Sequence, residues 1–167
     1  MRAARRAPNG MASAPSAGRE TMSANPKIGA QQLTVGEERE LVVVENLTRT
    51  QIVQYAGASG DFNPIHHDET FATKAAGYPS VFAHGMLTMG LTGKLVTEWL
   101  GDGVVREFGV RFVNQVWPGD TLTAKGTVKS IEAQGEESLV EIELVTLNQK
   151  GEPVVKGSAT ASLPARV

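Results

Sequence analysis

The sequence predicts an α+β fold, in which an antiparallel sheet packs against one long apolar helix. Residues 84–100 have helical spacing with apolar side chains around most of the circumference, so this helix must be surrounded by other parts of the protein. After Gly103, apolar and polar residues alternate in four segments joined by short turns, as they do in neighbouring antiparallel strands. The helix and the sheet can bury their apolar faces on each other.

The composition points to one domain and argues against several classes of protein. A chain of 167 residues has the ordinary size of a single domain. Its net charge is −2, so we expect no nucleic-acid partner. The apolar runs are too short to cross a bilayer, and we expect no membrane partner. The sequence contains no cysteine, which removes disulfides and thiolate chemistry. We expect a cytoplasmic protein.

Residues 1–27 differ in composition from the rest of the chain. They are rich in Ala, Ser, Pro and Arg, have no acidic residue before Glu20 and show no apolar periodicity, so we expect a disordered N-terminal extension. An acid-poor, Arg-rich start also fits an organelle transit peptide. We favour a true start at Met11 or Met22, or non-native residues. The predicted domain therefore comprises residues 28–167.

The first predicted elements are a strand and a short helix. Residues 40–47 are apolar and β-branched, as in a strand. Thr48 and Gln51 have the spacing of a capping box, in which the Thr hydroxyl caps the helix start. Glycines at 57 and 60 are expected to end this helix, so the next segment begins in a loop.

The loop that follows contains a rigid step. Asn63 must be extended because Pro64 follows it, and Pro64 has a fixed φ. A further short helix is expected from Asp68 to Gly77, with acidic residues at its start. The stiffened loop lies between the two short helices.

The long predicted helix at residues 84–100 contains three glycines. Gly85, Gly90 and Gly93 would each weaken a helix by about 1 kcal/mol. Because glycine has no side chain, another backbone or a ligand can come close at such positions. The late strands are expected at residues 104–112, 122–129, 140–144 and 155–163.

The chemistry of the sequence is concentrated around Asp61 and His66. Histidine exchanges a proton near neutral pH, and a nearby carboxylate can fix its tautomer or bind the same water molecule. The two residues lie five positions apart across the stiffened loop, so they could converge on one small molecule. On spacing alone, a catalytic pair and a chance pairing both remain open.

Gly85 is the second candidate. At a helix start its N–H has no partner inside the helix, and the helix dipole lies behind it. Such a group can stabilise a carbonyl oxygen that gains negative charge. The alternative is that Gly85 is only a packing residue.

Two motifs resemble those of a known family. The stretch YAGASGDFNPIH, from Tyr55 to His66, resembles the signature of MaoC-like, (R)-specific enoyl-CoA hydratases, and AHGM at residues 83–86 matches a second element of that family. The resemblance covers residues 30–163. It implies a hot-dog fold, in which an antiparallel sheet wraps around a long helix. The run MLTMG at residues 86–90 is most similar to the catalytic subunit of mycobacterial-type (3R)-hydroxyacyl-ACP dehydratases.

The resemblance implies a function and roles for individual residues. Asp61 and His66 would be the catalytic pair, the Gly85 N–H would form the oxyanion hole, and Asn63 and His84 would support the site. The reaction would be reversible hydration of trans-2-enoyl thioesters to (3R)-3-hydroxyacyl thioesters, with the acyl chain on CoA or on an acyl carrier protein. The family implies a homodimer or a heterodimer with a related hot-dog subunit, and no cofactor. One departure is Gly93, where some members carry a serine.

Other readings of the same residues carry less weight. His66, His67 and Asp68 are adjacent, their side chains diverge and no third ligand is suitably spaced, so we expect no metal site. We expect His67 to lie on the surface and His84 to be a buried histidine with its hydrogen bonds satisfied. Two alternative functions remain: a hot-dog acyl thioesterase, and a non-catalytic acyl-binding subunit of a dehydratase heterodimer. Acyl chain length and physiological direction are left open by the sequence.

Overall fold

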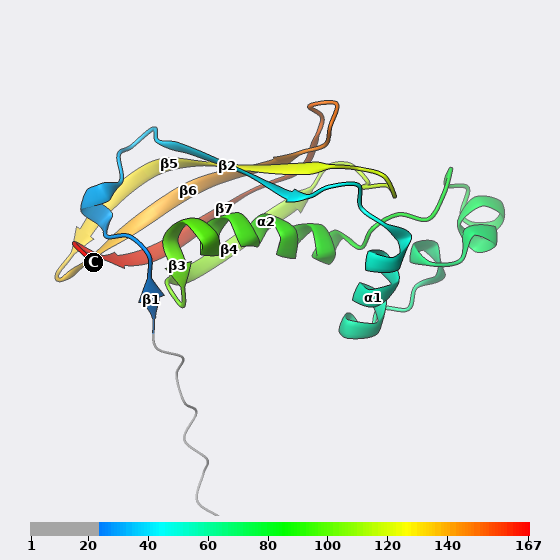
Figure 1. Ribbon diagram of the computed structural model, residues 1–167, viewed down its shortest axis with the longest axis horizontal. Helices are drawn as coiled ribbons and strands as arrows, with labels where there is room; N and C mark the ends of the chain where they lie inside the picture. Colours follow the sequence, from blue (N-terminus) through cyan, green and yellow to red (C-terminus); the bar gives the residue numbers. More distant parts are fainter. Residues whose placement is uncertain (1–23) are drawn as a thin grey trace, which may run out of the picture.

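The computed structural model, which describes residues 24–167, has a five-stranded antiparallel sheet arched over one long helix (Figure 1). The spatial order of the strands is β2-β5-β6-β7-β4. Their bounds are β2 Glu38–Val44, β4 Val105–Phe112, β5 Leu122–Gln134, β6 Glu137–Leu147 and β7 Pro153–Pro164. The long helix is α2, Gly85–Leu100. This arrangement confirms the predicted α+β class.

The alternating pattern read from the sequence places every second residue of β5 and β6 in the core along much of each strand, whereas the edge strand β4 has only exposed and half-buried residues. Strand β5 buries Leu122, Ala124 and Val128, and β6 buries Thr146 and Ile142, which pair with Ala124 and Val128. Both strands are longer than predicted, because they continue to a tight hairpin in which Gly135 has φ +66°. The extra residues are mostly exposed or half-buried, so the apolar pattern did not extend to them.

Helix α2 lies very close to the sheet at one position. A side chain on Gly126 of β5 would come within 3.2 Å of the Trp99 ring and 3.3 Å of Leu95, and both of these α2 residues are buried. The helix can approach the strand because position 126 has no side chain. The apolar core lies between α2 and the sheet, as predicted.

A buried polar contact also joins α2 to the sheet. The hydroxyls of Thr92 on α2 and Thr146 on β6 are 2.7 Å apart, and neither residue is exposed. Thr92 also donates to the carbonyl oxygen of Thr88, one turn earlier. Because the two hydroxyls can satisfy each other, burying them costs little.

Short helices connect β2 to α2 and lie beyond the end of the sheet, beside the start of α2 (Figure 1). Helix α1, Arg49–Ser59, has the predicted capping box at Thr48 and ends at Gly60, which has φ +76°. A single 3₁₀ turn, η2, follows at Pro64–His66. The short helix expected after Asp68 forms, but its residues Phe71–Ala75 (η3) are π-helical, which the sequence did not predict.

The N-terminal boundary of the ordered domain differs from the prediction. Most of the expected disordered extension lies outside the described residues, but Asn25–Pro26 forms strand β1 and pairs with β3, Gly101–Asp102. Gly101 has φ +111°, and a side chain there would collide with the Asn25 carbonyl. The expectation that the extension reaches residue 27 is therefore wrong for its last residues. A 3₁₀ turn, η1 Ala30–Gln32, then leads to β2. Within residues 24–167, no helix combines the length and the apolar character needed to cross a membrane.

Candidate active site

The predicted site residues come from three separate segments that meet at the start of α2. Asp61 follows α1, His66 ends the turn η2, and His84 immediately precedes α2. One carboxylate oxygen and one nitrogen from each histidine all lie within 4.8 Å of one another. The fold therefore brings Asp61 and His66 together and adds His84 to the pair.

The orientation of His66 is fixed by a main-chain carbonyl. Its ring is buried, and Nδ1 lies 2.7 Å from the carbonyl oxygen of Phe82. A carbonyl oxygen only accepts hydrogen bonds, so Nδ1 must carry the hydrogen. In the neutral ring, Nε2 is then the unprotonated nitrogen and can accept a proton. The site thus contains a base with one defined tautomer.

The environment of His66 favours this neutral form. Burial is the main reason that the pKa of His66 lies below its ordinary value of 6.5. The hydrogen bond to the Phe82 carbonyl and the charge of Asp61 oppose this shift, whereas His84 and His67 add to it. His66 therefore keeps its basic nitrogen at pH values where an exposed histidine would be protonated.

Asp61 is held by hydrogen bonds to its own loop. Its N–H donates to the Ser59 hydroxyl (3.2 Å), and its carboxylate Oδ1 accepts the N–H of Asn63 (3.2 Å). The Asn63 side chain in turn accepts the N–H of Ile65 (3.2 Å) at the start of the turn that carries His66. Asn63 thus connects the positions of Asp61 and His66, which fits the supporting role that the resemblance implies.

His84 makes closer contacts in the site than the sequence indicated. Its Nε2–H donates to the carbonyl oxygen of Asp61 (3.0 Å), and its ring stacks on His66 with the ring centres 3.8 Å apart. Tyr55 of α1 packs against it at 5.0 Å. Nδ1 of His84 is buried and has no hydrogen-bond partner among residues 24–167. The expectation that both ring nitrogens are satisfied is therefore wrong for Nδ1.

Gly85 is the first residue of α2, so its N–H has no partner inside the helix. Its backbone has an ordinary helical geometry, and the absence of a side chain matters for space. A Cβ at this position would lie 3.1–3.2 Å from three ring atoms of Phe112, at the end of β4. The Phe112 ring therefore stands directly beside the predicted oxyanion hole.

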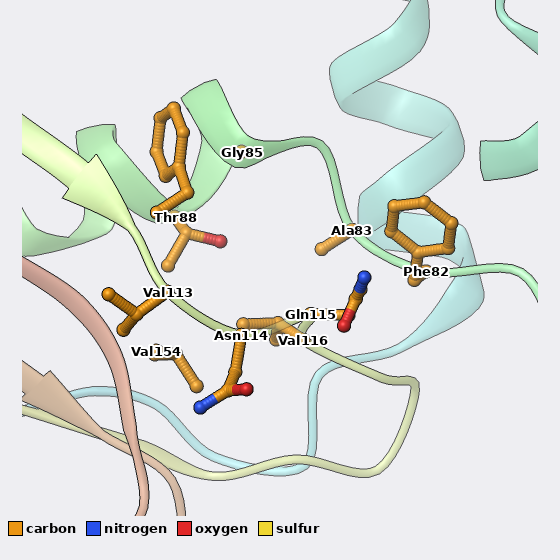
Figure 2. A pocket seen from close by; sticks show the side chains of 10 residues that line it. Phe82, Ala83, Gly85, Thr88, Val113, Asn114, Gln115, Val116 and Val154 are labelled. Atoms are coloured by element: carbon orange, nitrogen blue, oxygen red, sulfur yellow. The ribbon is translucent and has the colours of Figure 1, made fainter.

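A cavity of about 280 Å³ opens at Gly85. Figure 2 shows the hydroxyl of Thr88 and the amides of Asn114 and Gln115 as the polar side chains among mostly apolar walls. Asp61 and His66 are not part of its wall, but the Phe82 ring lies 5.2 Å from the His66 ring and also lines the cavity. The lining residues are Phe82, Ala83, Gly85, Thr88, Phe112, Val113, Asn114, Gln115, Val116 and Val154.

The three polar groups are close enough to raise the question of a metal ion, but their orientation is poor for one. The two imidazole planes are stacked, with an angle of 28° between them. Ring nitrogens bind a metal along the ring plane, and two nearly parallel planes do not direct their nitrogens to one point. One nitrogen of each ring also donates to a carbonyl. The arrangement fits proton transfer better, and the absence of a metal stays a prediction.

Comparison with known proteins identifies the family. Residues 30–150 match the family described as MaoC like domain. The chain belongs to this family. It is 31% identical to the (R)-specific enoyl-CoA hydratase of Rhodospirillum rubrum over 134 residues, which cover 79% of the chain and 90% of that enzyme.

Further relatives support the same family and the hot-dog fold. The 3-hydroxyacyl-thioester dehydratase Y of Mycobacterium tuberculosis is 43% identical over 68 residues, which make up 39% of the chain but only 23% of that relative. The unliganded R-hydratase of Pseudomonas aeruginosa superposes with a TM-score of 0.74 at 26% identity, covering 87% of the chain and 90% of that protein. A chain of the ChsH1–ChsH2 complex from M. tuberculosis gives 0.62 at 27% identity, with 78% and 98% covered.

Two residues of the site were missed in the sequence. Phe82 supplies the carbonyl that fixes His66, and Phe112 stands against Gly85. Neither contact has a local signal, because each joins segments 16 or more residues apart and depends on the complete fold. The only sequence signal for Phe82 is its place directly before the AHGM element.

Proposed function

We propose that this MaoC-like protein catalyses the reversible hydration of trans-2-enoyl thioesters to (3R)-3-hydroxyacyl thioesters. The observation that carries the proposal is that the Asp61 carboxylate and a ring nitrogen of His66 lie within 4.8 Å of each other and of His84, the residue directly before α2, where the N–H of Gly85 has no partner inside the helix. A base of defined tautomer, a carboxylate and a helix-start N–H are the groups that this reaction requires. The names of the relatives support the same reaction class.

The geometry suggests how the groups would divide the work. The thioester oxygen would accept the N–H of Gly85, which stabilises the enolate-like charge that develops when C3 is attacked. The Asp61–His66 pair would take one proton from a water molecule as its oxygen bonds to C3, and would deliver one proton to C2. In the reverse direction the pair would remove the C2 proton and protonate the leaving hydroxyl. We assign the two transfers to the pair as a unit.

The cavity at Gly85 is the candidate site for part of the substrate. Its volume of about 280 Å³ is just below the usual range for small-molecule sites, so it can hold only a portion of an acyl thioester. The carrier of the acyl chain would be CoA or an acyl carrier protein.

A partner subunit is also part of the proposal. Strand β4 is an edge of the sheet, and Phe112 and Val113 at its end are exposed apolar residues beside the cavity. A second copy of the chain, or a related hot-dog subunit as the ChsH1–ChsH2 neighbour suggests, would cover them. The cytoplasmic location stays a prediction.

The test is an assay with crotonyl-CoA and a longer enoyl-CoA. We expect loss of the enoyl-thioester absorbance and formation of the 3R alcohol, without release of free thiol. Free thiol would instead indicate a thioesterase. If the pure chain is inactive on both CoA esters, the assay is repeated with acyl-carrier-protein substrates and with co-purified subunits, and inactivity there would favour the acyl-binding alternative.

Variants connect the activity to the pair. Asp61→Asn and His66→Ala should each lower kcat by roughly 10²- to 10⁴-fold, the usual contribution of a general acid or base, while the thermal unfolding remains cooperative. His67→Ala is the matched control, because His67 is adjacent but exposed and bonded only to a loop carbonyl. Near-wild-type rates in both active-site variants would remove the pair from the mechanism.

A further inference from the structure

His84 contacts both members of the catalytic pair at once. Its Nε2–H donates a hydrogen bond to the main-chain carbonyl oxygen of Asp61, with 3.0 Å between the nitrogen and the oxygen. Its ring stacks on the ring of His66, with the ring centres 3.8 Å apart. The residue lies 23 positions after Asp61 and 18 after His66, and it is the N-cap residue of helix α2. It is the residue through which this helix could set the positions of both groups.

We propose that His84 is a positioning residue that fixes Asp61 by a hydrogen bond and His66 by ring stacking, so that the two catalytic groups keep one relative geometry. The inference rests on the proposed hydratase function. It assigns no substrate contact to His84, since its exposed fraction is only 2%.

The hydrogen bond acts on the turn that carries the carboxylate. Because the Asp61 carbonyl only accepts, Nε2 of His84 must carry the hydrogen, which leaves Nδ1 unprotonated in the neutral ring. The same residue's carboxylate accepts the N–H of Asn63. The carboxylate and the carbonyl of Asp61 are thus both held, and loss of the His84 bond would leave the peptide after Asp61 free to rotate.

The unpaired Nδ1 argues that His84 is not there for stability. A buried nitrogen without a hydrogen-bond partner costs about 1–3 kcal/mol, and Nδ1 is such a nitrogen. A phenylalanine of similar size would avoid this cost in a pocket formed by the rings of Tyr55 and His66. A phenylalanine, however, has no N–H to donate to the Asp61 carbonyl, and this hydrogen bond is what the histidine provides.

Stacking also has an electrostatic consequence for His66. A charge on either ring disfavours a charge on the other at this distance, and His84 is one of the groups that lower the pKa of His66. The other ionisable groups around His66 are Asp61, which opposes the shift, and His67, which adds to it slightly. Removing the imidazole at position 84 should therefore raise the pKa of His66.

Two substitutions separate the two contacts. His84→Phe keeps a flat ring against His66 but has no donor for the Asp61 carbonyl, whereas His84→Gln keeps an N–H donor but has no ring to stack. We expect kcat to fall roughly 10- to 100-fold in each, the size of effect that small misplacements of reacting groups produce, with KM changed less than threefold. The acid limb of kcat/KM should move to higher pH in both. His67→Gln, which exchanges an exposed histidine beside the site, should keep the wild-type kcat.

Nitrogen-15 NMR of the histidine rings gives a readout that needs neither activity nor a variant. In the wild-type protein at neutral pH, we expect the Nε2–H tautomer for His84 and the Nδ1–H tautomer for His66. The opposite tautomer at His84 would overturn the proposal, even if the His84 variants fail to fold. Folded variants that keep both the wild-type kcat and the wild-type pH profile would also overturn it. If the wild-type protein shows these tautomers but no hydratase activity, the proposed function fails and the positioning role with it.

Discussion

Substitution of Gly85 by alanine should remove activity without unfolding the protein. The added Cβ would lie 3.1–3.2 Å from three atoms of the Phe112 ring, whereas carbon atoms pack best at about 3.5–4.0 Å. The ring must therefore retreat by about 0.4 Å or more. It can do so because Phe112 is 47% exposed, and alanine favours a helix over glycine by about 1 kcal/mol. The free energy of unfolding should change by less than about 1 kcal/mol.

The effect on catalysis should be much larger. The methyl group would stand beside the Gly85 N–H, which we propose donates to the thioester oxygen. A thioester kept away from this donor should react about 10²- to 10³-fold more slowly, the effect of losing one oxyanion-hole donor. The assay is kcat and kcat/KM on an enoyl thioester, together with chemical unfolding. Gly90→Ala is the control, because Gly90 lies in the same helix with open space at its Cβ position, and it should keep full activity. A Gly85→Ala variant with near-wild-type kcat/KM would refute close approach of the thioester at Gly85.

Four further predictions concern pH and stability. Because the pKa of His66 is below 6.5 in the folded protein, kcat/KM should stay high as pH falls through 6.5 and should decline only at lower pH; a decline that begins above pH 6.5 would contradict this. The same shift means that the unfolded chain binds more protons than the folded protein just below pH 6.5. The free energy of unfolding should therefore decrease as the pH is lowered from 6.5 to the pKa of His66 in the folded protein. Urea titrations across that pH range would measure the decrease. Thr92→Val should cost about 1–3 kcal/mol by leaving the Thr146 hydroxyl buried without its partner, and adding Thr146→Val should recover much of that loss. Gly101→Ala should destabilise by more than about 1 kcal/mol, measured as a lower Tm, because its positive φ and the Asn25 carbonyl leave no room for a side chain.

Much of the fold was predictable because its elements carry local signals. The alternation around Val128 and Ile142 and the capping box at Thr48 act within one strand or one turn, and the structure has all of them. The short strand β1 was missed because its two residues pair with β3, which is equally short and lies far away in the sequence, directly after α2. The π-helical turn at Phe71–Ala75 was missed for a similar reason, since nothing in its composition distinguishes it from an ordinary helix.

The site was predictable only as a set of residues. Asp61, His66 and Gly85 could be named from motifs, but the sequence does not place the His84 ring on His66 or the Phe112 ring over Gly85. Those contacts depend on how α1, the loop and β4 are arranged around the start of α2. The tautomer of His66 was equally hidden, because it is set by a carbonyl from another segment.

Phe82 contributes to the site through two separate groups, its main-chain carbonyl and its side chain. Its carbonyl, which every amino acid possesses, fixes the base, while its ring forms part of the wall of the cavity. Replacement of the ring can therefore reshape the space offered to an acyl chain while the carbonyl still keeps the hydrogen on Nδ1 of His66. Position 82 is accordingly a site at which substrate range could diverge between relatives, or be redesigned, while the reaction itself is conserved.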